Sequence, residues 1–483
     1  MDEVRSLLAA ADPAQELAPC GLRHLVLGHE VLEQVGEIVA GLLGPTSAGG
    51  PRPRVALLVD RTRIVRAGED VKDLVEALLA ARFDVTRTVL DDGHAELHVV
   101  DHVLDAATTA ATGAHAVIAL GGGTISDIGK VAAQRTAEAG AAPVLVTVAT
   151  AASVDGYTDD VSVVIRDGVK RTVPSRWPDA VIADASLIAE APAAMNRAGY
   201  GEMTSMLTAP ADWTLAALVG FGERFHEAPL RLLEACGEGV EVWSSGVGRE
   251  EPDAVEQLTR VLTIRGIVTG VAGTTAALSG VEHLVSHMLD LHHAAHGLPV
   301  GLHGAQVGVA GLVAAAAWEM LHERMATAAT PPRLHRGLLD PRRARQRVMD
   351  AFAGLDVEGR IAEECWADYS VKLAAVDASR PLFEAVLIGW AKHAPVLRSR
   401  VRSTCELAAG LRAAGAAATF DQLDPRVEPD LARWAVGHCA LMRNRFTVVD
   451  LLTFLGWWGP DDVEEVLHRA QHAAVMATDA GET

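Results

Sequence analysis

The first 190 residues alternate between short apolar runs and stretches with helical periodicity. Helical periodicity is found at Val71–Ala81 and His98–Thr112. Most of the apolar runs are continuous, which is the pattern of parallel strands buried on both faces. The expected strands are Arg54–Asp60, Phe83–Leu90, His115–Leu120, Val144–Val148 and Ala180–Asp184. This alternation predicts an α/β domain with a parallel-rich, Rossmann-like sheet.

Two further β-rich runs, Val161–Ile165 and Val169–Val173, flank Asp167-Gly168. An Asp-Gly pair between two such runs predicts a hairpin. Basic side chains at Lys170, Arg171 and Arg176 follow the turn. They are either a cluster that binds an anionic substrate or a solvated hairpin edge, where Lys and Arg are common. In the first case we expect the cluster beside the Asp155 loop, at the carboxyl ends of the strands, where ligands bind in open α/β sheets.

From Pro192 to the end of the chain, the pattern becomes Ala- and Leu-rich and helical. We therefore expect an all-α second domain, with domain limits of 1–190 and 191–483. The helices expected in it include Met203–Leu218, Ala254–Thr269, Val307–Met320 and Arg342–Phe352. The Val307–Trp318 run is too short to span a bilayer, so we expect no transmembrane segment.

The formal net charge of −21 argues against a nucleic acid or an anionic membrane as partner. A small anionic substrate needs only a local basic pocket, so it remains compatible with this charge. The five cysteines are scattered and form no CxxC pair, which indicates reduced thiols in a cytoplasmic protein. The composition leaves homo-oligomerisation open.

Three glycines, Gly121, Gly122 and Gly123, join the strand His115–Leu120 to a following helix. Uncovered backbone N–H groups at a helix N-terminus form a cradle for a pyrophosphate. The alternative is a tight turn that merely requires small residues. Asp60, at the end of an early strand, is placed either to hold a cofactor ribose or to cap a helix.

Six of the nineteen histidines fall between Ser279 and Gly308. His283 and His287 are four residues apart and share one face of a helix, and His303 follows in a turn. Imidazole is a common ligand for zinc-like metals, so this window predicts either a metal site or a merely His-rich helix end. We expect His292, His293 and His296 to be solvated loop residues.

Taken together, these motifs resemble the superfamily that joins dehydroquinate synthase, glycerol dehydrogenase and the iron-containing alcohol dehydrogenases. Within it, the chain is most similar to the sn-glycerol-1-phosphate dehydrogenase family. The stretches that carry the resemblance are Gly121–Lys130, Thr150–Tyr157, Val181–Asp184, Ser279–His287, Leu302–Gly308 and Met442–Leu452.

The resemblance implies a dehydroquinate synthase-like fold, in which an α/β nucleotide domain and a helical metal domain flank the active site. It implies one divalent metal, zinc or alternatively iron or nickel, held by Glu202, His283 and His303. It also implies NAD or NADP as cofactor and a small-molecule substrate, reduced or oxidised at a carbinol or carbonyl carbon. The residues expected at the nucleotide are Asp60, Gly121, Gly122, Gly123, Thr124, Asp127, Thr150 and Ser153. Those expected at the substrate are Asp155, Lys170, Arg171, Arg176 and His287, with Asp155 and His287 in catalytic roles.

Glu202 stands where the resembled dehydrogenases carry Asp, and Met206 lies where they carry a Lys. Glu202 is shared with the dehydroquinate synthases, so a sugar-phosphate cyclase that uses NAD transiently is the alternative function. The Ser279–His287 stretch lacks the Asn-x-Gly-His-x-x-Gly-His pattern of those synthases. A non-catalytic nucleotide-binding protein is a further alternative, although the retained Glu202, His283 and His303 argue against it.

Overall fold

The protein was analysed as a computed structural model, which describes residues 1–45, 50–94, 96–166, 169–221 and 225–479. The chain forms two compact units. The first unit comprises Met1–Gly199, Arg231–Glu238 and Gly246–Gly273, and the second comprises Tyr200–Leu230, Gly239–Ser245 and Thr274–Thr483. Neither unit is continuous in sequence, and the division into domains at residue 190 stays a prediction.

The first unit is built on a six-stranded sheet in which all neighbouring strands are parallel. The strand order is β1-β10-β7-β6-β2-β5. The expected parallel α/β sheet is therefore confirmed, with one additional edge strand, β1, that the apolar pattern did not indicate. The strands are β1 (His24–Gly28), β2 (Arg54–Val59), β5 (Asp84–Val89), β6 (Ala116–Gly121), β7 (Val144–Ala149) and β10 (Ala180–Asp184).

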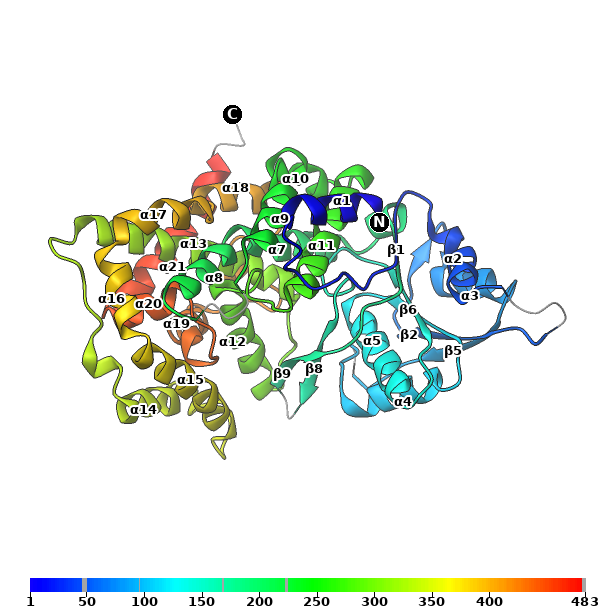
Figure 1. The fold of residues 1–483 in the computed structure, drawn as a ribbon, viewed down its shortest axis with the longest axis horizontal. Coiled ribbons are helices and arrows are strands. Elements are labelled where there is room, and N and C mark those ends of the chain that lie inside the picture. The colour runs from blue at the N-terminus through cyan, green and yellow to red at the C-terminus, as the bar shows by residue number, and fades with distance from the viewer. Residues whose placement is uncertain (46–49, 95, 167–168, 222–224, 480–483) are drawn as a thin grey trace. The chain divides into compact units, whose positions relative to one another are not determined.

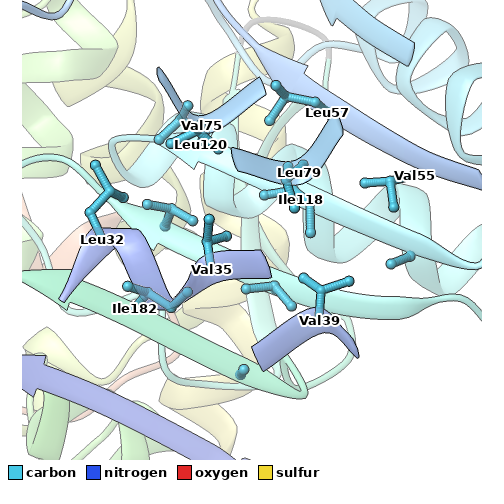
Figure 2. Close-up of a cluster of buried hydrophobic side chains, with 14 of the residues drawn as sticks. Leu32, Val35, Val39, Val55, Leu57, Val75, Leu79, Ile118, Leu120 and Ile182 are labelled. Carbon is cyan, nitrogen blue, oxygen red and sulfur yellow. The ribbon is translucent and has the colours of Figure 1, made fainter. Parts of the chain in front are cut away.

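Helices cover both faces of this sheet, as Figure 1 shows. On one face, α2 (Val35–Leu43) and α3 (Val71–Ala80) pack against alternate strand residues such as Leu57, Ile118 and Ile182. Figure 2 shows this buried cluster. On the other face, α4 (Asp101–Ala111) and α5 (Gly123–Glu138) pack against the intervening strand residues. Burial on both faces explains why the four inner strands, β2, β6, β7 and β10, are continuous apolar runs in the sequence.

The expected hairpin is confirmed as an antiparallel pair, β8 (Val161–Arg166) and β9 (Val169–Pro174). The Asp167-Gly168 turn itself lies outside the described residues. A second small hairpin consists of β3 (Val65–Arg66) and β4 (Glu69–Asp70). The first unit also contains α1 (Asp2–Ala11), α6 (Ala185–Ala189) and the whole of α11 (Pro252–Ala272).

After β10, the described residues form helices and loops but no strand, as expected. The predicted helix Met203–Leu218 is broken at Thr208, ahead of Pro210, into η2 and α8. The α-helices are α7 (Ala193–Thr204), α8 (Ala209–Leu218), α9 (Glu227–Gly237), α10 (Val240–Gly248), α11, α12 (Val281–Ala295), α13 (His303–Thr327), α14 (Pro341–Phe352), α15 (Arg360–Ala378), α16 (Arg380–Ile388), α17 (Trp390–Ser399), α18 (Thr404–Ala413), α19 (Pro429–His438), α20 (Val448–Phe454) and α21 (Pro460–Asp479). Short 3-10 turns are η1 (Leu32–Gln34), η2 (Ser205–Leu207), η3 (Arg336–Leu338), η4 (Phe420–Gln422) and η5 (Cys439–Leu441).

The longest helix, α13, extends the expected Val307–Met320 segment at both ends to 25 residues. By length and composition alone it could cross a membrane, but 89% of its most apolar window is buried inside the protein. That burial is typical of a core helix.

Candidate metal and nucleotide site

The three predicted metal ligands lie together in the second unit. Glu202 is at the end of α7, His283 is in the first turn of α12, and His303 begins α13. One ligand atom from each lies within 4.8 Å of the others. His283 Nε2 is 3.3 Å from Glu202 Oε1, and His303 Nε2 is 3.8 Å from Glu202 Oε2. Each imidazole therefore turns the same nitrogen toward one buried carboxylate.

Hydrogen bonds on the far side of each ring set the tautomers. His283 Nδ1 lies 3.1 Å from Glu282 Oε1, and a carboxylate can only accept, so Nδ1 carries the proton. Ser286 Oγ donates to Gln306 Oε1 at 2.6 Å, so it accepts from His303 Nδ1 at 2.9 Å. In the neutral form of each ring, Nε2 therefore carries the lone pair that faces Glu202, which is the form that a metal ligand requires.

A close helix crossing brings Glu202 to His303. An added Cβ at Gly201 would overlap the carbonyl oxygen of Gly304, and one at Gly308 would lie 2.9 Å from the Cα of Gly201. Only glycine at these positions lets α7 approach α13 so closely. In the sequence, glycines stand directly beside Glu202 and His303, at Gly201 and Gly304.

Electrostatics at the site favour a positive charge. Burial on its own would lower the pKa of His283, but Glu202 and Glu282 raise it to about 9. The protonated ring and a divalent cation therefore compete for the same place beside Glu202.

His287 lies one turn along α12, and its ring stacks on that of His303 with centroids 5.6 Å apart. Asp290 follows on the same face, and His287, Asp290 and His303 offer ligand atoms within 4.8 Å of one another. Asp290 was not foreseen from the sequence, although its spacing of three from His287 could have indicated it.

The expectation that His292, His293 and His296 are solvated loop residues is wrong for two of them. His292 and His293 belong to α12, and His293 is buried with 2% of its surface exposed. The helix continues through the polar pattern because its last turn packs on other helices. Only His296, which caps α12, is exposed.

The glycine loop in the first unit joins β6 directly to α5, with Gly122 as the N-cap of the helix. A Cβ at Gly121 would crowd Ile125, and one at Gly123 would lie 2.7 Å from Val154. A Cβ at Gly122 would meet only the methyl group of Met195, at 3.9 Å. Packing within the protein does not explain the glycine at 122, whereas a ligand lying against the backbone would.

The other residues expected at the nucleotide flank this loop or hold it. Thr124 is half-buried in the first turn of α5, and Thr150 and Ser153 are buried in the segment after β7. The Asp127 carboxylate accepts from the backbone N–H of Val163 and lies 3.2 Å from Lys130 Nζ. Asp127 thus ties α5 to the hairpin, and its contact with a nucleotide stays a prediction.

Asp60 lines a pocket of about 160 Å³ at the carboxyl ends of β2 and β5. Its Oδ1 accepts from Lys72 Nζ at 2.7 Å, and Lys72 is buried. This lysine was not foreseen, because a Lys near the start of a helix is normally expected to be exposed to solvent. The pocket is lined by Asp60, Arg61, Thr62, Leu90, Asp91, Asp92, His94 and Leu97.

Asp155 pairs with a cation that the sequence did not indicate. Arg265 Nη2 lies 3.0 Å and Nε 3.2 Å from Asp155 Oδ2, and Arg265 is fully buried in α11. Arg265 is 110 residues away from Asp155 in sequence, so no local spacing could have paired them.

Of the hairpin cations, Lys170 and Arg171 lie on β9 opposite Ile165 and Val164, and both are half-buried. The expected position of Arg176 at the carboxyl ends of the strands is wrong. Arg176 binds Asp179 Oδ2 at 2.8 Å and the Pro143 carbonyl at 3.0 Å, at the amino ends of β10 and β7. Because β10 is parallel to β7, the chain must return to the amino ends of the strands before β10 begins. Arg176 lies in this returning segment.

Comparison with known proteins places this fold in a class. The sequence profile of iron-containing alcohol dehydrogenases matches residues 27–192. The chain also shares its fold with a probable glycerol dehydrogenase from Sinorhizobium meliloti, at a TM-score of 0.54 and 15% identity, over 95% of this chain and 98% of that one. Glycerol dehydrogenase from Schizosaccharomyces pombe gives a TM-score of 0.55 at 14% identity, over 95% and 92% of the two chains. The dehydroquinate synthase-like fold expected from the motifs is confirmed.

Sequence relatives narrow the class. A glycerol-1-phosphate dehydrogenase [NAD(P)+] from Natronomonas pharaonis is 31% identical over 60% of this chain and 76% of the relative. One from Bacillus velezensis is 26% identical over 70% of this chain and 69% of the relative. The chain belongs to the glycerol-1-phosphate dehydrogenase family of the iron-containing alcohol dehydrogenases.

Proposed function

We propose that the protein is a metal- and NAD(P)-dependent oxidoreductase that reduces dihydroxyacetone phosphate, or a closely related small keto phosphate, to the matching alcohol. The observation that carries the proposal is the Glu202, His283 and His303 set, in a chain whose relatives are named glycerol-1-phosphate dehydrogenases. A cytoplasmic location belongs to the same proposal and is supported by five free cysteines.

The donor set fits a divalent ion, with zinc as the first choice and iron or nickel as alternatives. A carboxylate and two neutral imidazoles leave such an ion with a net charge near +1, and an ion of that kind supplies a Lewis acid for a substrate oxygen. The chain's own task is to hold both Nε2 lone pairs in place, through Glu282 on one ring and Ser286 on the other. His287, half-buried beside His303, is the proposed proton donor to the substrate oxygen.

The nucleotide is proposed to lie against the backbone of Gly121, Gly122 and Gly123. Nicotinamide supplies or accepts the hydride, and the helix N-terminus of α5 contributes partial positive charge to the pyrophosphate. Thr124, Thr150 and Ser153 are the side chains proposed beside it. Lys170 and Arg171 are the remaining candidates for the substrate phosphate.

The alternative, a cyclase that releases phosphate while using NAD transiently, rests on Glu202 alone. The relatives reported above are named as dehydrogenases, which favours net oxidoreduction.

The test is an assay of the zinc-loaded protein with dihydroxyacetone phosphate and reduced nicotinamide nucleotide. We expect one nucleotide to be oxidised for each glycerol phosphate formed, and the Glu202→Gln variant to be inactive. Chiral analysis of the product then identifies glycerol 1-phosphate. Release of inorganic phosphate from a sugar phosphate, with no net oxidation of nucleotide, would move the protein to the cyclase alternative.

A further inference from the structure

The segment after β7 is fixed without any help from the ion pair between Asp155 and Arg265. Thr158 Oγ1 donates to the Thr263 carbonyl at 2.8 Å, which ties the segment to α11. Lys130, buried in α5, binds Asp159 Oδ1 at 2.6 Å. At Gly266, α11 approaches so closely that an added Cβ would overlap Thr158. The backbone of the segment is therefore held by contacts from two helices.

An additional structural contact for this segment does not require a buried arginine, whose burial is energetically unfavourable. Removing a guanidinium from water costs several kcal/mol, and apolar side chains of similar volume often replace buried ion pairs without loss of stability. What the guanidinium alone provides is a fixed direction and a permanent charge for a carboxylate. Both Nε and Nη2 of Arg265 reach the same oxygen of Asp155, Oδ2, which fixes the position of that oxygen.

Exposure within the pair is unequal. The Arg265 side chain has no exposed surface, whereas 20% of the Asp155 side chain is exposed. A ligand can therefore reach the carboxylate but not the cation behind it. A carboxylate accepts hydrogen bonds from hydroxyl groups and repels phosphate. The pair thus suits the hydroxyl end of a hydroxy-ketone and does not suit its phosphate end.

We propose that Arg265 is a positioning residue of the substrate site. It holds the Asp155 carboxylate oriented, as the acceptor for a substrate hydroxyl next to the keto carbon. This inference rests on the proposed function, and it specifies the substrate class as small keto compounds with a neighbouring hydroxyl.

The experiment compares Arg265→Lys, Arg265→Met, Asp155→Asn and the double variant Asp155→Asn/Arg265→Met in the zinc-loaded protein. Arg260→Met is the matched control, because Arg260 lies on the same helix with an exposed side chain. The readouts are kcat and KM for dihydroxyacetone phosphate, the dissociation constant of the reduced nucleotide, and the thermal unfolding midpoint.

We expect Arg265→Lys to lower kcat/KM roughly tenfold, since a misplaced positioning group costs one to two orders of magnitude. Nucleotide affinity and the unfolding midpoint of this variant should stay unchanged. Arg265→Met should lower kcat/KM as far as Asp155→Asn does, and the double variant should be no worse than Asp155→Asn alone. Rescue of activity by Lys relative to Met would support the positioning role.

Two results would overturn the inference without touching the proposed function. One is full kcat/KM in Arg265→Met combined with a lowered unfolding midpoint, which is the result of a purely structural pair. The other is additive losses in the double variant, because independent effects exclude action of Arg265 through Asp155. If Arg265→Met does not fold, Arg265→Lys and the charge-neutral double variant still distinguish a positioning role of Arg265 from a purely structural one. A wild-type protein that turns over no keto compound would instead refute the proposed function, and the inference would fall with it.

Discussion

At the scale of single residues, the candidate metal ligands are oriented by side chains that are not themselves candidate ligands. Ser286 can accept from His303 Nδ1 only because its own proton goes to Gln306, so two polar side chains decide which ring nitrogen is available. Partners of this kind typically change metal affinity by about 10–100-fold. The site is therefore larger than the three residues that the sequence indicates.

We predict a graded loss of metal along this chain of contacts. His303→Ala should abolish stoichiometric zinc binding, and Ser286→Ala should weaken it by about 10–100-fold, because the tautomer of His303 is no longer fixed. Affinity is measured by competition with a zinc chelator. His296→Ala is the control, since His296 is exposed at the end of α12. Full zinc occupancy in His303→Ala would refute the ligand assignment.

His322 gives a prediction about pH. It is buried in α13 beside Trp318 and Trp390, and neither ring nitrogen has a hydrogen-bond partner among the residues that the structure describes. Burial, with a smaller effect of Arg398, lowers its pKa from 6.5 to about 4. The unfolded chain therefore binds this proton at a higher pH than the folded chain does, so stability falls as the pH drops from 6.5 toward 4.

The His322→Phe variant should lose this part of the acid sensitivity, which is at most about 3 kcal/mol. Urea unfolding at neutral and mildly acidic pH measures the effect as a difference between the two free energies of unfolding. His468→Gln, at an exposed position of α21, is the control. An unchanged pH dependence in His322→Phe would show that the folded protein takes up this proton as readily as the unfolded chain.

At the scale of elements, the junction of β6 and α5 is the clearest case of a local structure that packing does not explain. Gly122 has φ of −81°, which any residue adopts, and its added Cβ would meet only Met195. Gly122→Val should therefore fold normally and lose nicotinamide nucleotide binding, because the side chain occupies the space above the backbone N–H groups.

Calorimetry with reduced nucleotide tests this prediction, and thermal unfolding checks that the variant folds. Gly41→Val in α2 is the matched control, because a Cβ at Gly41 is not crowded either, with nothing within 4 Å, and it lies away from the loop. Unchanged nucleotide affinity in Gly122→Val would place the nucleotide elsewhere.

Most elements of the sheet could be predicted because burial on both faces leaves a continuous apolar run. β1 is different: its residues are half-buried or exposed at the edge of the sheet, so hydrophobicity does not distinguish His24–Gly28 from a loop. The ends of helices were harder to predict from the sequence than the strands. α12 continues through His292 and His293 because the second of them is buried, which the polarity of histidine conceals.

In the candidate site too, some residues could be predicted from the sequence and others could not. Glu202, His283 and His303 could be found from motifs because glycines and histidines mark them locally. Arg265 could not, because its partner lies far away in sequence. Arg176 was predicted at the wrong end of the strands. The sequence does not show how far the chain runs back toward the amino ends of the strands before β10 begins.

At the scale of the whole molecule, each unit carries a separate part of the chemistry. The candidate metal ligands all belong to the second unit, and the glycine cradle, Asp60 and Asp155 all belong to the first. The segment 246–273, which holds Arg265, returns to the first unit although it lies between the two candidate ligands Glu202 and His283 in sequence. Loss of metal and loss of nucleotide are therefore expected to be separable by mutation.

The charge of the first unit at the Asp60 pocket predicts a preference for NADH over NADPH. Three carboxylates line the pocket, from Asp60, Asp91 and Asp92, and its one arginine, Arg61, is held by Asp91 at 3.0 Å. A 2′-phosphate adds about two negative charges and normally needs a nearby arginine. We expect NADH to bind at least about tenfold more tightly, with the difference shrinking as salt screens the carboxylates.

Asp91→Asn should strengthen NADPH binding by releasing Arg61, whereas Glu37→Gln, outside the pocket, should not. Fluorescence titration measures both affinities, and tighter binding of NADPH by the wild type would show that Arg61 leaves Asp91 for the phosphate.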